Sequence, residues 1–363
     1  MRVNVPKKTL ADVLSNVERI IPARSSNPGL SLLRIDLEEG RLVLSGSSLD
    51  IDVRAVVPAD AKGGGSHAVV GHVFSMVVRS LPADDVELDF TDSELQITSG
   101  RYTTKLQLVA ASSSPVVSFP QDFPGAIDAQ RLKHALTSAR YAAAVADFQQ
   151  VFRGVKLEMA DDRFRAVATD GFRLAYYDLG VGSGLHGDVI VPARSIDELV
   201  RVLGEGEVRL ALGGGQLSVS HGDYTLNLKL MEGTFPDYER VIPKDFPISI
   251  SLSAARLSEA VNRVALMADK TANNRVDLFV KDGTVTITAE GSYGRSQEEL
   301  PVMQEGRDSE IAVAYNARFL VDALGPIGGD VRLMFSGVSS SPSVVRDLAD
   351  DNYLAMVVPL RTS

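Results

Sequence analysis

The stretch ELQITSGRYTTKLQL (94–108) lies over QLSVSHGDYTLNLKL (216–230), and this internal match decides the fold. At a single offset of 122 residues Tyr102 aligns with Tyr224, together with a neighbouring glycine, a threonine and several leucines. The same offset aligns leucines near the start of each unit, so one register holds across roughly 100 residues. Repetition at this period predicts units of domain size rather than a solenoid of short repeats.

A third copy of the unit is looser than the first two. AQRLKHAL (129–136) resembles AARLSEAV (254–261), and IDELVRVLGEGEVRLAL (196–212) resembles FLVDALGPIGGDVRLMF (319–335). The offset drifts between 121 and 125 residues, as small loop insertions would require. The sequence therefore predicts three structurally similar domains.

Borders between these domains are expected at two segments rich in Pro and Phe, because Pro favours extended linkers. These segments are SSSPVVSFPQDFPG (112–125) and GTFPDYERVIPKDFP (233–247). The predicted domains are accordingly 1–122, 123–245 and 246–363.

Helical and strand patterns alternate within each unit. Residues 10–21 place apolar side chains at helical spacing, whereas 41–57 and 284–296 alternate as half-buried antiparallel strands do. Ser195 followed by Glu198 predicts a capping box at the start of the second helix of the middle unit. Two strands are expected to close each unit, and helices on antiparallel sheets define an α+β class. The second helices are predicted over 73–81, 195–203 and 317–324.

The composition excludes several kinds of site. The 363 residues include no Cys, so disulfides and thiolate metal sites are impossible, and the five His residues lack metal-ligand spacing. No P-loop, dinucleotide motif or nucleophile elbow is present. We therefore expect no catalytic residue, no metal and no cofactor. No apolar run approaches a membrane span and no signal peptide is visible, so a cytoplasmic location is expected.

Two segments stand out against this background. VATDGFRLAYYDL (167–179) predicts two strands with Thr169, Asp170 and Gly171 at the turn between them. EGTFPDYERVIP (232–243) combines aromatic residues, Pro and charges at the second domain border. A purely structural interpretation would make the first a tight hairpin and the second a linker.

The motifs of these segments resemble those of the bacterial sliding-clamp family, the beta subunit of DNA polymerase III. ATDGFRLA is similar to the family's A-T-D-G-H-R-L-A, and EGTFPDYERVIP to its G-R-F-P-D-Y-R-R-V-L-P. VIVPARSIDELVRVL (189–203) and the ending YLAMVVPLR also resemble family segments, in the same order along the chain. Phe172 stands where the family usually has His, and the tail VVPLRTS departs from V-M-P-M-R-L, so the preferred peptide is expected to differ.

This resemblance implies a fold and a function. The family fold is a head-to-tail homodimer of three-domain subunits that closes into a ring, with helices on the inner face and antiparallel sheets outside. Such a ring encircles double-stranded DNA without reading its sequence and tethers the polymerase for processive synthesis, without being an enzyme. The implied partners are double-stranded DNA, the DNA polymerase III catalytic subunit, the clamp-loader complex, translesion polymerases, mismatch-repair proteins and a second copy of the chain, all in the cytoplasm at the nucleoid. The net charge of −10 is then expected on the outside of the ring, with basic residues facing in.

Three groups of site residues follow from the resemblance. Residues expected to contact DNA are Arg24, Arg79, Arg140, Gln149 and Arg194. The pocket for partner peptides, between the second and third domains, is expected to comprise Phe152, Thr169, Gly171, Phe172, Arg173, Leu174, Pro236, Val241, Met356, Val358, Pro359, Leu360 and Arg361. Leu266 and Met267 are expected at the dimer interface, with a core position for Leu266 as the open alternative. Other basic helix residues, Arg19 and Arg201 among them, carry suitable charge or are simply solvated.

Two other classes of function remain open at this point. A hydrolase on a duplicated scaffold could use Asp170 and a nearby His, but no nucleophile–base pair is visible. A structural repeat protein would scatter its basic residues over all faces, whereas a clamp concentrates them on the helices.

Overall fold

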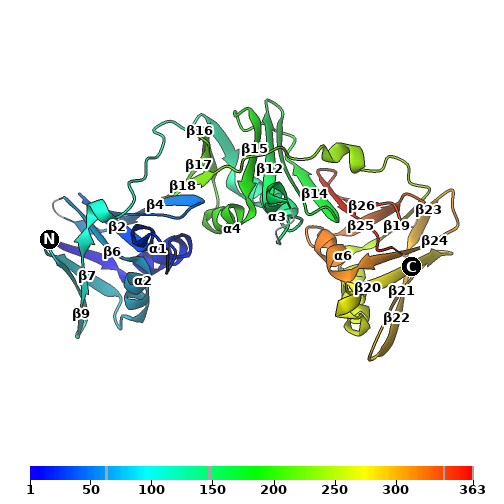
Figure 1. Ribbon diagram of the computed structural model, residues 1–363, viewed down its shortest axis with the longest axis horizontal. Coiled ribbons are helices and arrows are strands. Elements are labelled where there is room, and N and C mark those ends of the chain that lie inside the picture. The colour runs from blue at the N-terminus through cyan, green and yellow to red at the C-terminus, as the bar shows by residue number, and fades with distance from the viewer. Residues whose placement is uncertain (62–63, 146–148, 338–339, 362–363) are drawn as a thin grey trace. The chain divides into compact units, whose positions relative to one another are not determined.

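One order of elements occurs three times in the computed structural model, which describes residues 1–61, 64–145, 149–337 and 340–361 (Figure 1). Each copy runs strand, helix, four main strands, helix, three strands. The predicted α+β class and three similar domains are therefore confirmed.

The elements of the three copies have the following bounds. The first copy contains β1 (Arg2–Pro6), α1 (Lys7–Ile20), β2 (Leu32–Glu38), β3 (Arg41–Ser47), β4 (Ile51–Pro58), β6 (Gly65–Val70), α2 (Gly71–Ser80), β7 (Asp85–Phe90), β8 (Glu94–Ser99) and β9 (Tyr102–Gln107). The second contains β11 (Gly125–Asp128), α3 (Ala129–Arg140), β12 (Gly154–Ala160), β13 (Arg163–Thr169), β14 (Arg173–Asp178), β15 (Gly187–Pro192), α4 (Ala193–Val202), β16 (Glu207–Gly213), β17 (Gln216–His221) and β18 (Tyr224–Lys229). The third contains β19 (Ile248–Ser253), α5 (Ala254–Val264), β20 (Arg275–Lys281), β21 (Thr284–Gly291), β22 (Gly294–Pro301), β24 (Glu310–Asn316), α6 (Ala317–Leu324), β25 (Asp330–Phe335), β26 (Ser343–Asp347) and β27 (Tyr353–Val357). Short extra strands are β5 (Asp60–Ala61), β10 (Val109–Ala110) and β23 (Met303–Gly306).

Two details of the predicted unit are wrong. Three strands close each unit rather than two, because the first of them returns to pair with the strand that opens the unit, as β7 does with β1. The capping box is also absent, since β15 ends at Pro192 and α4 follows directly at Ala193. Ser195 therefore lies inside the helix, buried, and its hydroxyl has no hydrogen-bond partner among the described residues.

By its internal contacts the chain divides into two compact units, each described by itself. The first comprises residues 1–130, 183–185 and 194–230, and the second the remaining segments 131–182, 186–193 and 231–363.

The first unit contains two antiparallel sheets. A nine-stranded sheet has the order β10-β6-β2-β3-β4-β18-β17-β16-β11, and a five-stranded sheet has the order β5-β1-β7-β8-β9. The pairing of β4 with β18 makes the larger sheet continuous from the first copy into the second, with Ala55 opposite Tyr224. Helix α1 packs against α2, β3 and β4, and it buries Leu10, Leu14 and Val17 at the predicted helical spacing.

The second unit repeats this arrangement. Its nine-stranded sheet has the order β15-β12-β13-β14-β27-β26-β25-β19-β23, and a four-stranded sheet has the order β22-β21-β20-β24. Here β14 pairs with β27, with Tyr177 opposite Tyr353, so the second copy is joined to the third by a shared sheet. Each fully buried aliphatic or aromatic side chain in such a core contributes roughly 1.5–3 kcal/mol.

Two kinds of feature are absent from the part of the chain that the structure describes. No helix there is long and apolar enough to cross a membrane. No group of three or more His, Asp or Glu side chains there is arranged to hold a metal ion.

Candidate partner-binding site

The turn between β13 and β14 is built by its own polar side chains. Asp170 Oδ1 accepts hydrogen bonds from the backbone N–H groups of Phe172 (2.9 Å) and Arg173 (3.0 Å). Thr169 Oγ1 accepts from Gly171 N at 3.1 Å and donates to the carbonyl of Arg173 at 2.7 Å. Gly171 has a φ of +88°, which suits a residue without Cβ. The turn therefore presents the Phe172 side chain to solvent, 61% exposed.

Arg173 follows Phe172 but points into the protein. The residue is 6% exposed, and its Nε lies 2.9 Å from Asp170 Oδ2. Its guanidinium also lies 4.5 Å from the centre of the Phe319 ring and 5.6 Å from that of Tyr141. These contacts hold the base of the turn, so Arg173 positions Phe172 rather than offering a free guanidinium to a ligand.

The C-terminal tail is attached to the same turn. Leu174 lies opposite Met356 in the β14–β27 pair, and the Val358 N–H donates to the Phe172 carbonyl at 2.9 Å. Leu360 N donates to the carbonyl of Ala314 in β24 at 2.8 Å. The tail thus runs from the turn to β24. Pro359 is buried and Arg361 exposed, whereas the last two residues, 362 and 363, lie outside the described residues.

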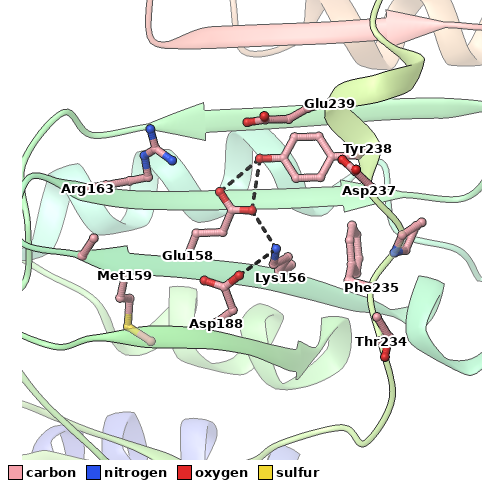
Figure 2. Close-up of a pocket in the computed structure, with 12 residues that line it drawn as sticks. Lys156, Glu158, Met159, Arg163, Asp188, Thr234, Phe235, Asp237, Tyr238 and Glu239 are labelled. Carbon is pink, nitrogen blue, oxygen red and sulfur yellow. Dashed lines mark hydrogen bonds and ion pairs between the residues drawn. The ribbon is translucent and has the colours of Figure 1, made fainter.

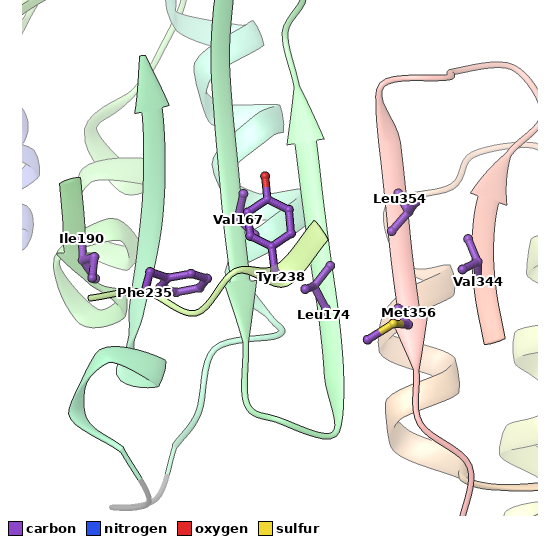
Figure 3. Packing of buried hydrophobic residues seen from close by; sticks show 8 residues of the cluster. All are labelled: Val167, Leu174, Ile190, Phe235, Tyr238, Val344, Leu354 and Met356. Carbon is purple, nitrogen blue, oxygen red and sulfur yellow. The ribbon is translucent and has the colours of Figure 1, made fainter. Parts of the chain in front are cut away.

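The linker segment 232–243 crosses the sheet beside this turn. Its Phe235 and Tyr238 are buried in an apolar cluster that also contains Leu174 and Met356, as Figure 3 shows. Pro236 and Val241 of the same segment remain exposed, as does Phe172. The remaining members of the cluster are Val167, Ile190, Val344 and Leu354. Exposed apolar side chains above a buried apolar floor form the kind of surface on which a short peptide packs.

Polar side chains anchor the linker from its other side, around a cavity of about 560 Å³ (Figure 2). The Tyr238 hydroxyl donates to Glu158 Oε2 at 3.0 Å and accepts from Arg165 Nη1 at 2.9 Å. Lys156 Nζ lies 2.8 Å from Glu158 Oε1 and 2.9 Å from Asp188 Oδ2. These groups satisfy one another, and the network is suited to fixing the linker rather than to proton transfer.

Two pKa shifts reflect this network. Burial raises the pKa of Tyr238 well above its usual range, although the hydrogen bond from Arg165 opposes the shift. Burial alone would lower the pKa of Lys156, but hydrogen bonds to Glu158 and Asp188 outweigh it and the pKa is raised. At neutral pH the phenol is therefore un-ionised and the ammonium charged, which preserves every hydrogen bond of the anchor.

The structure brings most of the expected pocket residues together. Gly171, Phe172, Leu174, Met356 and Val358 are linked by strand pairing or hydrogen bonds. Phe152 is buried, and its ring lies beside the turn. A Cβ added to Gly171 would come within 3.9 Å of that ring. Sequence reasoning missed the anchoring partners Asp322, Glu158 and Arg165, because isolated charged residues on a helix or strand are indistinguishable from solvated ones.

The residues expected to contact DNA lie at or beside helices. Arg24, Arg79 and Arg194 are exposed in the first unit, and Gln149 is exposed in the second. Arg140 is half-buried at the end of α3, where its Nε donates to the carbonyl of Ala193 at 3.1 Å.

The expected dimer residues lie at the end of α5. Leu266 is 77% exposed there, which excludes the alternative of a core position, and Met267 is half-buried. Met267 packs toward Gly294 at the start of β22, an edge strand of its sheet.

Comparison with known proteins places the whole chain in one group. Residues 1–118, 126–237 and 239–361 match the N-terminal, central and C-terminal domains of the DNA polymerase III beta subunit. The beta sliding clamp of Pseudomonas aeruginosa is 30% identical, with 99% of this chain and 100% of that protein covered. That of Caulobacter vibrioides is also 30% identical over the same shares. A solved structure of the Pseudomonas aeruginosa sliding clamp bound to griselimycin has a TM-score of 0.92 and 28% identity, with both chains fully covered.

Proposed function

The chain belongs to the DNA polymerase III beta-subunit family, the beta sliding clamps, and on that premise we propose that it encircles duplex DNA and tethers the replicative polymerase. The observation that carries this proposal is the ordered match of all three domains over nearly the full chain. A beta sliding clamp is a processivity factor and is not itself catalytic.

The simplest test of this function uses DNA topology. A ring holds DNA by encirclement, so the protein loaded on a nicked circular duplex should remain bound at high salt and should leave once the circle is linearised. Equal retention on the circle and on the linear form would contradict the proposal. The corresponding partners are the polymerase and the clamp loader. The corresponding location is the cytoplasm around the nucleoid.

Ring closure through a second copy of the chain is supported by the pattern of strand pairing. In both shared sheets, the third of the four main strands of one copy pairs with the last strand of the next: β4 with β18, and β14 with β27. By this rule β22 and β9 await an equivalent neighbour, because each pairs on one side only, with β21 and β8, and lies at an edge of its sheet among the described residues. An open edge is a template for another strand, and a head-to-tail contact that repeats can close into a ring. We therefore propose that β22 pairs with β9 of a second copy.

The repeat also supplies the register of this contact. In each shared sheet, the fifth residue of the third main strand lies opposite the first residue of the last strand of the next copy. The observed pairs are Ala55 with Tyr224 and Tyr177 with Tyr353. By the same rule Glu298, the fifth residue of β22, lies opposite Tyr102 of the second copy, and Gln297 opposite Thr103.

The absence of Cys from the sequence makes a clean cross-linking test possible. The double variant Thr103→Cys, Gln297→Cys should form a covalent dimer on oxidation, visible on a denaturing gel, because opposite residues bring their Cβ atoms within disulfide range. Thr103→Cys with Ser296→Cys is the matched control, since a one-residue shift turns the second thiol to the other face of the sheet. The uncross-linked protein should have a solution mass near twice 38.9 kDa. A monomeric mass would contradict the closed ring.

We further propose that the turn, the linker and the tail form a pocket for short peptides of the polymerase, the clamp loader, translesion polymerases and mismatch-repair proteins. Support comes from the exposed Phe172 and Val241 beside the buried Leu174 and Met356. Deleting residues 359–363 should abolish stimulation of the polymerase and leave the dimer intact. Deleting only residues 362–363 is the control and should preserve stimulation. Full stimulation by the longer deletion would contradict this pocket.

The DNA-contacting role of the exposed arginines can be separated from peptide binding. Changing Arg24 and Arg79 together to Glu should slow loading onto DNA, because a phosphate backbone repels the new charges. Peptide affinity should remain unchanged, since both residues lie in the first unit and the pocket lies in the second. Normal loading by this variant would remove both residues from the DNA-binding surface.

A further inference from the structure

Three arginines from three helices converge on one cavity of the first unit. The cavity has a volume of about 430 Å³ and lies at the end of α1. Arg19 comes from α1, Arg79 from α2 and Arg201 from α4. Each of the three side chains is about half exposed, at 48%, 51% and 49%. Ser15, Asn16 and Glu18 complete the lining.

Glu18 is the first of two carboxylates that engage these arginines. Its Oε2 lies 2.9 Å from Arg79 Nη2, and the same oxygen accepts a hydrogen bond of 2.6 Å from the Ser75 hydroxyl. Ser75 is fully buried, so it fixes the carboxylate on the floor of the cavity. Arg79 is therefore paired with a carboxylate, that of Glu18, whose position is fixed by a second hydrogen bond.

Glu198 is the second carboxylate, and it is shared between two helices. Its Oε2 accepts a hydrogen bond of 3.1 Å from Arg19 Nε and lies 3.5 Å from Arg201 Nε. Glu198 is only 8% exposed, beneath the two guanidinium groups. The three arginines and two glutamates leave one net positive charge at the cavity.

We propose that this cavity is a seat for one backbone phosphate of duplex DNA, and that Glu18 and Glu198 are resident counter-ions that weaken its grip. The proposal rests on the proposed clamp function. A phosphodiester has one negative charge and suits a cavity with one net positive charge. Because the carboxylates already neutralise two guanidinium groups, a passing phosphate releases fewer counter-ions than three free arginines would allow. The ring therefore dissociates readily from each phosphate and can slide along the duplex.

A purely structural role is the competing explanation, since the Arg19–Glu198 pair also links α1 to α4. The two roles predict different results for a neutral, isosteric substitution. A structural ion pair, once broken, changes stability and leaves DNA contacts as they were. A counter-ion, once removed, frees an arginine for phosphate and changes the dependence of DNA binding on salt.

The test uses the full-length protein and the variants Glu18→Gln, Glu198→Gln and their combination. Affinity for a short duplex is measured by fluorescence anisotropy between 50 and 200 mM salt, a range in which such contacts weaken strongly. The slope of log affinity against log salt should steepen with each substitution, by up to about 0.9 in all, because the freed guanidinium groups neutralise the one phosphate more fully. One-dimensional diffusion of the loaded ring, followed by single-molecule tracking, should slow severalfold in the double variant. Glu207→Gln is the matched control, because Glu207 pairs with Arg209 at 3.2 Å on strand β16 and should change neither quantity.

A second variant separates the two explanations. Adding Arg79→Gln to Glu18→Gln should return the salt slope to that of the wild type, because the freed guanidinium is removed with its counter-ion. Unchanged salt slopes and diffusion in all Glu variants, with altered melting temperatures, would overturn the proposal. Loss of the wild-type ring from nicked circular DNA would instead overturn the clamp function on which the proposal rests.

Discussion

Nη1 of Arg173 lies 2.5 Å from Oδ2 of Asp322, an ion pair that joins the first residue of β14 to helix α6. The same guanidinium contacts Asp170 in the turn that presents Phe172. A single buried cation therefore connects the helix of the third domain to the rim of the proposed peptide pocket.

Arg173→Ala should destabilise the protein by about 3 kcal/mol, because it leaves Asp170 and Asp322 without their shared cation. Urea-induced unfolding measures the loss. Arg318→Ala is the control, since Arg318 also approaches Asp322, at 3.7 Å, but its side chain is 74% exposed. Exposed pairs contribute at most about 1 kcal/mol, so a comparable loss in both variants would contradict the special role of Arg173.

Phe172→Ala should weaken binding of a polymerase-derived peptide by about 1 kcal/mol, or roughly fivefold in Kd, because a peptide side chain loses apolar area to cover. Isothermal titration calorimetry gives the affinity. The free energy of unfolding should change little, since the side chain is 61% exposed. Leu49→Ala, at a residue 78% exposed in the first unit, should leave peptide affinity unaltered. Equal affinity of wild type and Phe172→Ala would exclude Phe172 from the pocket.

Gly171→Ala should cost about 1 kcal/mol of stability, because its φ of +88° is strained for a residue with a Cβ. The variant should also lower peptide affinity by displacing Phe172. Gly213→Ala is the comparison, since a Cβ there meets nothing within 4 Å and the backbone is not in the strained region. Chemical denaturation of both variants distinguishes backbone strain from the general effect of the substitution.

Stability should fall at alkaline pH in a way that depends on Tyr177. Burial, assisted by the hydrogen bond to Asp350, raises the pKa of Tyr177 to about 12. In the unfolded chain the phenol has a pKa of about 10, so the unfolded state loses its proton first. The contribution of Tyr177 is therefore complete below pH 10 and declines as the pH rises toward about 12.

Urea unfolding at a series of pH values checks this dependence. Tyr177→Phe should flatten the decline between pH 10 and 12, whereas Tyr293→Phe, at a residue 97% exposed, should follow the wild type. Parallel curves for wild type and Tyr177→Phe would show that the Tyr177 phenol does not couple to folding.

Much of each domain was predictable from local pattern. The apolar spacing of residues 10–21 predicted α1, although the helix begins at Lys7, and α6 spans residues 317–324 as predicted. The missed closing strand and the wrong capping box have one cause. Strand and helix limits at Pro192 and Ala193 depend on pairing with distant strands, which a short window of sequence does not contain.

The candidate site was predictable only in part. Resemblance to family motifs indicated Phe172, Leu174 and Met356, and the structure brings them together through the β14–β27 pair. The partners that hold them were not predictable, because Asp322 lies 149 residues from Arg173 and looks like any charged residue on an amphipathic helix.

The sequence by itself determined that three like domains follow one another, because periodicity and a shared register are local properties of the chain. Only the tertiary structure decided how the domains share sheets, through β4 with β18 and β14 with β27, and which edges stay open. It also decided that Glu198 is buried in ion pairs with Arg19 and Arg201 and does not cap a helix. Side-chain pattern specifies the buried face of a strand, whereas the partner at its edge is chosen by backbone hydrogen bonds common to every residue.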